Sequence, residues 1–111
     1  MLEKTTQMNL LYDFYGVMLT EKQREFVELY YLDDLSLAEI AEQFEISRQA
    51  VHDNIRRASA QLLDYEAKLH LVERFERRRE VGSRVLSLLE NNPSQQEREQ
   101  ISALVRELIE E

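Results

Sequence analysis

The spacing of apolar residues along the 111-residue chain predicts helices and no strands. Apolar side chains between residues 8 and 19 recur at intervals of three and four, which places them on one face of a helix. The β-branched residues form no alternating runs, and the commonest residues, Leu and Glu, both favour helices. Only two Gly and one Pro interrupt the pattern. The sequence therefore predicts an all-α protein.

Small polar residues mark the expected helix starts after this first helix. Three of them are followed three residues later by Glu or Gln, the capping-box pattern that satisfies free backbone amides: Thr20 with Gln23, Ser36 with Glu39, and Ser94 with Glu97. Ser47 is a further N-cap residue. The second helix is expected to end at Asp33-Asp34, and a short third helix to start at Ser36.

The fourth helix carries an unbroken heptad stripe of the following residues: Val51, Ile55, Ala58, Leu62, Tyr65, Leu69 and Val72. No Gly or Pro occurs before Gly82, so we expect this helix to run from Ser47 to about Arg79. The cluster Arg77–Arg79 would suit a helix C-terminus, or alternatively a patch for RNA or an acidic partner. Two amphipathic stretches, 81–89 and 94–109, are separated by Asn91-Asn92-Pro93 and predict a C-terminal αα-hairpin.

Residues 36–57 have the pattern of a helix-turn-helix, in which a short helix crosses a capped second helix after a tight turn. Ile40 and Ala41 fit the crossing, and Ile46 fits the turn, where Glu45 stands at a position that favours positive φ. With Ala50, Val51 and Ile55 buried, the start of the second helix would present polar side chains outward. We expect nucleic-acid contacts from Ser47, Arg48, Gln49, His52, Arg56 and Arg57.

On these residues the chain resembles the helix-turn-helix in the fourth region of bacterial sigma factors. The resemblance covers residues 19–62 and rests on Leu19-Thr20, Arg24, Leu29-Tyr30, Ser36–Ala41, Ile46–Val51 and Arg57. It is fairly specific for the fold and much less so for function.

Almost the whole chain also resembles the YlxM family of small helix-turn-helix proteins. The matching segments are Met8–Tyr15, Leu19–Arg24, Tyr30-Tyr31, Ser47–Arg57 and the helical tail. This resemblance implies a bacterial cytoplasmic protein whose gene neighbours those of the signal recognition particle GTPases. It thereby implies a regulatory role in that targeting pathway. A sequence-specific DNA-binding transcription regulator is the alternative.

The charge of the chain limits which partners are expected. The formal net charge is −8, and residues 20–60 hold five basic and nine acidic residues. Phosphate contacts are made largely by Lys and Arg, so this balance excludes indiscriminate binding to polyanions. A narrow contact through the arginines of the fourth helix remains open, with DNA, RNA or a protein as the ligand.

The second half of the heptad stripe lies beyond the expected helix-turn-helix core and needs a cover, because exposed leucines are costly. Either the C-terminal hairpin or a second copy of the chain could supply it, and we expect a homodimer. The sequence thus predicts a helix-turn-helix domain at 1–62 and a dimerising extension at 63–111. The expected interface residues are Leu62, Tyr65, Leu69, Val72, Val85, Leu89, Leu104 and Leu108.

Catalysis, cofactors and membrane insertion are not expected. The chain has no Cys, and His52 and His70 are not at a metal-binding spacing. There is no Gly-rich phosphate loop, no long apolar run and no signal-peptide pattern at the start. The sequence therefore predicts a soluble intracellular binding protein that is not an enzyme.

Overall fold

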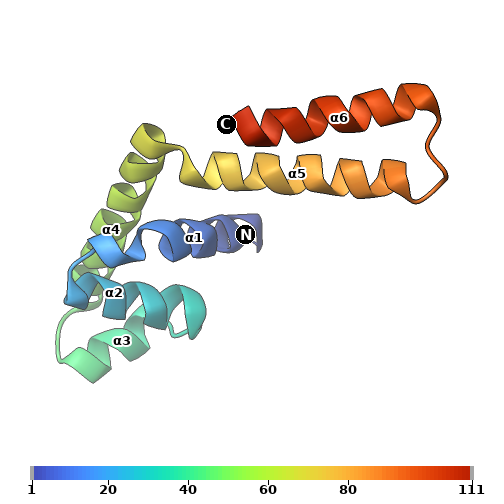
Figure 1. Cartoon of the computed structure of the whole chain (residues 1–111). Coiled ribbons are helices and arrows are strands. Elements are labelled where there is room, and N and C mark those ends of the chain that lie inside the picture. Colours follow the sequence, from blue (N-terminus) through green and yellow to red (C-terminus); the bar gives the residue numbers. More distant parts are fainter. Residues whose placement is uncertain (1, 111) are drawn as a thin grey trace. The chain divides into compact units, whose positions relative to one another are not determined.

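The computed structural model describes residues 2–110, and the side chains of residues 6–110 (Figure 1). This part of the chain is all-α and contains no strand, as predicted. The helices are α1 (Leu2–Tyr15), α2 (Glu21–Val27), α3 (Leu37–Phe44), α4 (Arg48–Leu69), α5 (Leu71–Leu89) and α6 (Gln95–Glu110). A 3-10 turn, η1 (Gly16–Met18), follows α1, and a π-helix, η2 (Glu28–Leu32), continues α2. The chain forms two compact units, Met1–Val72 and Glu73–Glu111.

The predicted caps are present at four helix starts. Thr20, Ser36 and Ser94 each accept a hydrogen bond from the backbone N–H three residues later, and the Gln or Glu there accepts one from the cap's own N–H. Ser47 Oγ accepts from the Ala50 N–H at 3.0 Å. These bonds satisfy amides that a helix leaves free at its N-terminus, which is why the sequence locates these starts so well.

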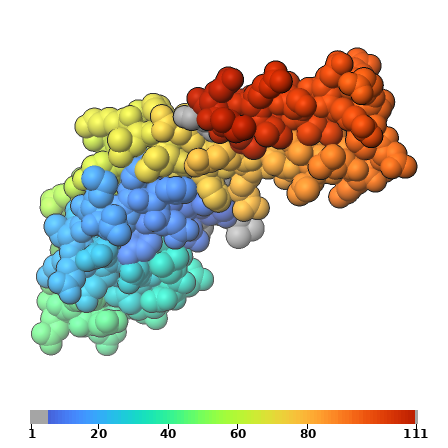
Figure 2. Space-filling model, viewed as in Figure 1, coloured from blue at the N-terminus to red at the C-terminus, as the bar shows by residue number. Residues whose placement is uncertain are grey.

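The helix-turn-helix has its own apolar core. Ile40 and Ala41 of α3 pack with Phe26, Val51 and Ile55. Glu45 adopts the left-handed conformation at the turn, with φ of 55°, as its place in the motif predicts. Figure 2 shows α3 and the start of α4 at one end of the N-terminal unit. The buried core of the motif therefore holds α4 in place, with the polar side of its first turns facing solvent.

A second core lies between α1 and the middle of α4, and it corrects the predicted interface. Leu11 and Tyr15 pack with Leu62 and Val72, and Tyr15 stacks on Tyr65 with ring centroids 5.9 Å apart. Leu62 is 0% exposed and Val72 is 4% exposed. The cover for this part of the stripe is the chain's own first helix, so Leu62 and Val72 are not available to a second copy.

The long helix breaks earlier than predicted. It ends at Leu69, where His70 takes a left-handed conformation with φ of 58°, and α5 starts directly afterwards. Tyr15 Oη accepts a hydrogen bond from the Leu71 N–H at 3.0 Å and donates one to Glu66 Oε1 at 2.5 Å. Glu66 Oε1 also accepts from the Val72 N–H at 3.0 Å. Tyr15, which is distant in sequence, thus supplies part of the cap of α5, so the local pattern did not reveal the break.

The C-terminal unit holds two antiparallel helices, as the predicted hairpin requires (Figure 1). However, α5 continues through Arg79 and Gly82, so the reading of Arg77–Arg79 as a helix end is wrong. The guanidinium of Arg77 instead bonds Glu107 on α6, at 3.0 Å from both Nε and Nη2. Within residues 2–110, no helix is long and apolar enough to cross a lipid bilayer.

One expected inner-face residue of the first helix is exposed. Met18 was expected on the buried side but lies in η1, where its side chain is exposed. The helical periodicity ends at Tyr15 because the chain turns at Gly16 to reach α2. Leu19, one residue later, is buried as expected.

Candidate nucleic-acid interface

The first turns of α4 present two exposed rows of polar side chains. Val51, Ile55, Ala58 and Leu62 are buried against the rest of the unit. Because a helix turns by roughly 100° per residue, Arg48, His52 and Arg56 form one row at four-residue spacing. Gln49, Asp53 and Arg57 form the second row. All of these are exposed except Asp53, which is half-buried.

Gln49 and Asp53 lie on the line of α4 that is directly opposite its buried stripe. Arg56 lies to one side of that line and Arg57 to the other, each about half a right angle away at roughly 100° per residue. The centre of the exposed face is therefore an amide and a carboxylate, with a guanidinium on either side.

Asp53 organises the polar contacts within this face. Gln49 Nε2 donates a hydrogen bond to Asp53 Oδ1 at 3.0 Å, and His52 Nδ1 lies 3.8 Å from the same oxygen. The side chains of His52 and Asp53 are 54% and 34% exposed. Asp53 is not among the contact residues predicted from the sequence, although its spacing of four residues from Gln49 was a usable signal.

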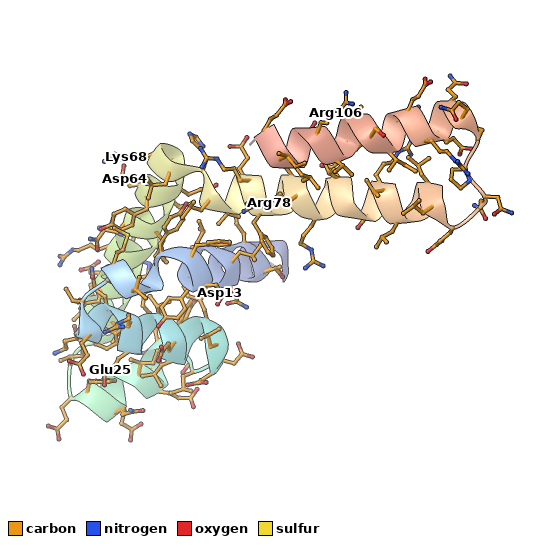
Figure 3. The ribbon with its side chains drawn as sticks, in the orientation of Figure 1. Asp13, Glu25, Asp64, Lys68, Arg78 and Arg106 are labelled. Carbon is orange, nitrogen blue, oxygen red and sulfur yellow. The ribbon has the colours of Figure 1, made fainter. Side chains whose placement is uncertain are left out.

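The arginines of the face have no carboxylate partner among the described residues. Ion pairs of the described residues include those that join His52 to Asp53, Lys68 to Asp64, and Arg77 to Glu80 and Glu107. Figure 3 shows Lys68 beside Asp64 near the end of α4. Arg48, Arg56 and Arg57 are thus free to form bidentate bonds with phosphate or carboxylate groups.

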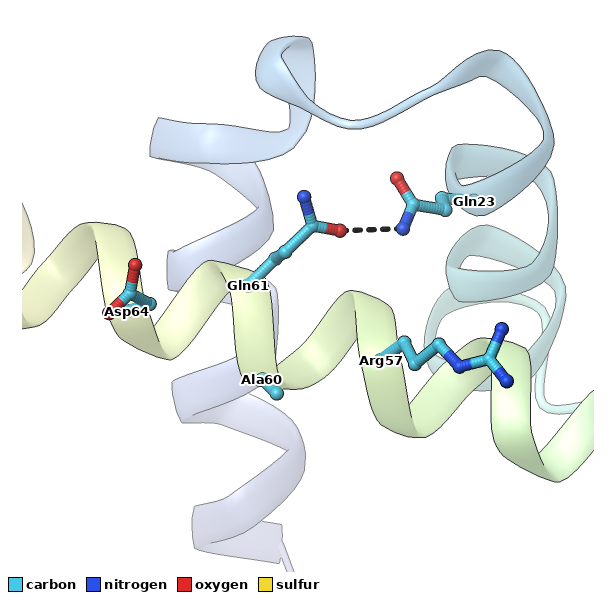
Figure 4. Close-up of a pocket in the computed structure, with 5 residues that line it drawn as sticks. All are labelled: Gln23, Arg57, Ala60, Gln61 and Asp64. Carbon is cyan, nitrogen blue, oxygen red and sulfur yellow. Dashed lines mark hydrogen bonds between the residues drawn. The ribbon is translucent and has the colours of Figure 1, made fainter.

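A shallow groove of about 480 Å³ lies beside Arg57, between the start of α2 and the middle of α4 (Figure 4). Gln23 and Gln61 cross it with a hydrogen bond of 2.6 Å between Nε2 and Oε1. The Arg57 side chain points away from Asp64, which lines the other end of the groove (Figure 4). The groove thus offers one cation and two amides to a ligand alongside the exposed face.

Acidic side chains surround this cationic face. Glu39 and Glu42 are exposed on α3, and Glu45 is exposed at the turn. The carboxylate of Glu39 accepts the Ser36 amide in its capping box, and this hydrogen bond lowers its pKa. It is therefore ionised at neutral pH, and a ligand with many phosphates would be repelled outside a narrow line of contact.

Five of the six predicted contact residues are exposed on the first turns of α4: Arg48, Gln49, His52, Arg56 and Arg57. Ser47 lies next to them, with its hydroxyl oxygen engaged in the cap. Within residues 2–110, no three His, Cys, Asp or Glu side chains lie close enough together to hold a metal ion. The chemistry that this surface offers is recognition of an anionic or hydrogen-bonding ligand.

Comparison with known proteins identifies the family to which this architecture belongs. The family model described as "Putative helix-turn-helix protein, YlxM / p13 like" matches residues 2–105. The chain belongs to the UPF0122 family. The resemblance to the YlxM family seen in the sequence is therefore confirmed.

Relatives in the UPF0122 family cover most of the chain. A UPF0122 protein of Geobacillus kaustophilus is 54% identical over 110 residues, which is 99% of this chain and 98% of the relative. A UPF0122 protein of Bacillus mycoides is 57% identical over 89 residues, or 80% of this chain and 81% of the relative. One from Bacillus anthracis is 56% identical over 89 residues, with the same coverage. The similarity therefore extends beyond the helix-turn-helix.

Proposed function

We propose that this chain is a bacterial regulatory protein that binds DNA through the exposed face of α4. The observation that carries the proposal is the set of three unpaired arginines beside Gln49 on a buried helix-turn-helix scaffold. Arg pairs with phosphates and with guanine edges, and Gln pairs with adenine, in the major groove. The acidic surroundings favour a narrow, oriented contact over binding to any polyanion.

A mobility-shift assay on genomic fragments at low salt tests this proposal. We expect the full chain to retard at least one fragment. The test variant replaces three arginines of α4 by Gln, namely Arg48, Arg56 and Arg57. Its affinity for that fragment should be lower than wild type by about tenfold or more. The matched control removes the same charge by replacing exposed arginines of α5 and α6 by Gln, namely Arg84, Arg98 and Arg106. The affinity of this control for DNA should stay within about twofold of wild type. If the wild-type chain retards no fragment, DNA binding is not its function.

Regulation of the signal recognition particle pathway is the second proposal. It is supported by membership of the YlxM-like family over residues 2–105 and by the net charge of −8, which limits contact with long nucleic acids. We expect the chain to copurify with the targeting GTPases or their RNA, or to change their rate of GTP hydrolysis. Lysates treated and not treated with nuclease would separate the protein from the RNA partner. No effect at micromolar concentration would contradict this role.

We also propose that the C-terminal unit forms a homodimer. Three apolar side chains are half-buried within the hairpin: Val85, Leu104 and Leu108. Four others are exposed: Leu86, Leu89, Val105 and Ile109. By helical geometry, these four lie on one side of the hairpin and the Arg77–Glu107 ion pair on the other. A two-helix hairpin buries little apolar area alone, so a second hairpin on this side would complete a four-helix bundle. We place the two proposed roles, DNA binding and regulation of the signal recognition particle pathway, in the bacterial cytoplasm.

A further inference from the structure

We infer that Asp53 is the specificity-determining residue of the α4 face and that it selects a cytosine in the major groove. This inference rests on the proposed DNA binding and deepens it. Asp53 lies at the centre of the exposed face, on the line opposite the buried stripe of α4. A recognition helix inserted into the major groove directs this line toward the base edges and its flanks toward the phosphates.

The position of the carboxylate keeps it away from the DNA backbone. Arg56 and Arg57 flank Asp53 on either side, and neither has a carboxylate partner among the described residues. When these guanidiniums bind phosphates of the two strands, Asp53 is left facing the floor of the groove. The negative charge at the centre of the face is thereby compatible with a polyanionic ligand, provided that a base edge donates to it.

The contacts of Asp53 fix which atoms it offers. Gln49 Nε2 donates to Oδ1 at 3.0 Å and holds the carboxylate in place along the helix. Ionised carboxylates only accept hydrogen bonds, so Oδ2 requires a donor from the base. In the major groove, cytosine presents its N4 amino donor with no acceptor beside it, whereas adenine presents its N6 donor next to the N7 acceptor. Guanine presents the two acceptors O6 and N7. Asp53 therefore favours cytosine and repels guanine at the same position.

Selection from a pool of random-sequence duplex DNA tests this inference with the full chain. We expect wild-type sites to share a cytosine at one fixed position, preferred over guanine by about tenfold or more. Both Asp53→Asn and Asp53→Ala should lose that preference, because neither side chain offers a carboxylate. The matched control is Asp13→Asn, which changes an exposed carboxylate on α1. It should leave the selected sequence unchanged.

The outcomes distinguish this inference from the proposal beneath it. If wild type selects a sequence in which no cytosine depends on Asp53, the specificity role is wrong and DNA binding stands. If the Asp53 variants keep the wild-type sequence, the specificity role is equally wrong. If wild type retains no sequence from the pool, the proposed DNA binding fails and the role of Asp53 fails with it.

Discussion

The two glycines of the chain lie in different surroundings. A Cβ atom added to Gly16 would lie 2.8 Å from Cε1 of Tyr12, a ring whose hydroxyl donates a hydrogen bond to Glu28. A Cβ atom added to Gly82, within α5, would meet nothing within 4 Å. Gly16 is thus required by close packing where α1 turns toward α2. Gly82 lies within a helix that has room for a side chain, where Gly is less stabilising than Ala because it loses more conformational entropy on folding.

Substituting each glycine by alanine should therefore have opposite effects on stability. We expect Gly16→Ala to lower the free energy of unfolding by about 1–3 kcal/mol, because the Tyr12 ring must move. Gly82→Ala should raise it by about 0.5–1 kcal/mol, because alanine reduces the entropy of the unfolded chain. Urea denaturation of both variants measures the two changes, and changes of the same sign would contradict the packing described.

The Tyr12 hydroxyl gives the protein a response to alkaline pH. Burial, followed by the hydrogen bond and charge of Glu28, raises its pKa from 10.0 to about 12. Since the folded pKa lies above the unfolded one, this contribution to stability is complete below pH 10 and is lost as pH rises toward 12. Tyrosinate absorbance should show one group titrating near pH 12 that Tyr12→Phe removes. Glu28→Gln should lower that pKa, and an unchanged titration would contradict the assignment.

At the scale of elements, the start of α5 depends on side chains from two other helices. The Tyr15 hydroxyl and the Glu66 carboxylate accept the first amides of α5, those of Leu71 and Val72. Burial raises the pKa of Tyr15, and the bond to Glu66 raises it further, so the hydroxyl stays protonated and donates to that carboxylate. The end of α4 and the first turn of α5 are thereby tied to α1.

Tyr15→Phe should remove the hydrogen bonds of the Tyr15 hydroxyl with little change in the shape of the side chain. The Leu71 N–H and the Glu66 carboxylate would each lose a partner in a buried site, so we expect a loss of about 1–3 kcal/mol in stability. Amide hydrogen exchange should accelerate at Leu71 in particular. The matched control is Tyr31→Phe, whose hydroxyl makes a long contact of 3.4 Å with Ser59 Oγ. An equal loss in the two variants would show that the Tyr15 cap has no special role.

The elements that the sequence predicted well are those specified by neighbouring residues. The capping boxes at Thr20, Ser36 and Ser94 and the left-handed Glu45 all depend on contacts within a few positions. The break at His70 depends on Tyr15, more than fifty positions away, which no local pattern encodes. The same reason explains why the cover of Leu62 by α1 was missed.

The binding face was predictable in its residue types but not in its internal order. Helical spacing alone indicates that Arg48, His52 and Arg56 share a row. The polar contacts of Asp53, by contrast, depend on the rotamers of Gln49 and His52, which only the structure provides. The structure therefore adds Asp53 to the candidate contact residues, as the proposed reader of a base.

At the scale of the whole molecule, the dimer proposal makes a prediction about mass. We expect light scattering to give about twice the chain mass of 13.2 kDa at micromolar concentration. Leu86→Asp and Ile109→Asp should each weaken association by about tenfold or more, because each places a charge in the proposed interface. The control Val17→Asp changes a residue that is 79% exposed in the N-terminal unit and should leave the mass unchanged. A mass near 13.2 kDa for wild type at all concentrations would contradict the dimer.

The acidity of the molecule makes the salt dependence of the proposed DNA binding its most informative test. A net charge of −8 opposes non-specific attraction, so the proposal attributes binding to the few cations of the α4 face. Each phosphate contact contributes about −0.9 to the slope of log affinity against log salt concentration. The slope therefore gives the number of arginines that contact phosphates.

Fluorescence anisotropy on a selected duplex, repeated across salt concentrations, tests the central claim most directly. We predict a clear negative slope for wild type that becomes shallower by about one unit for each of Arg48, Arg56 and Arg57 replaced by Gln. The control replacements at Arg84, Arg98 and Arg106 should leave the slope unchanged. A wild-type slope that the α4 replacements do not alter, or the absence of any binding, would contradict a DNA-binding face on α4.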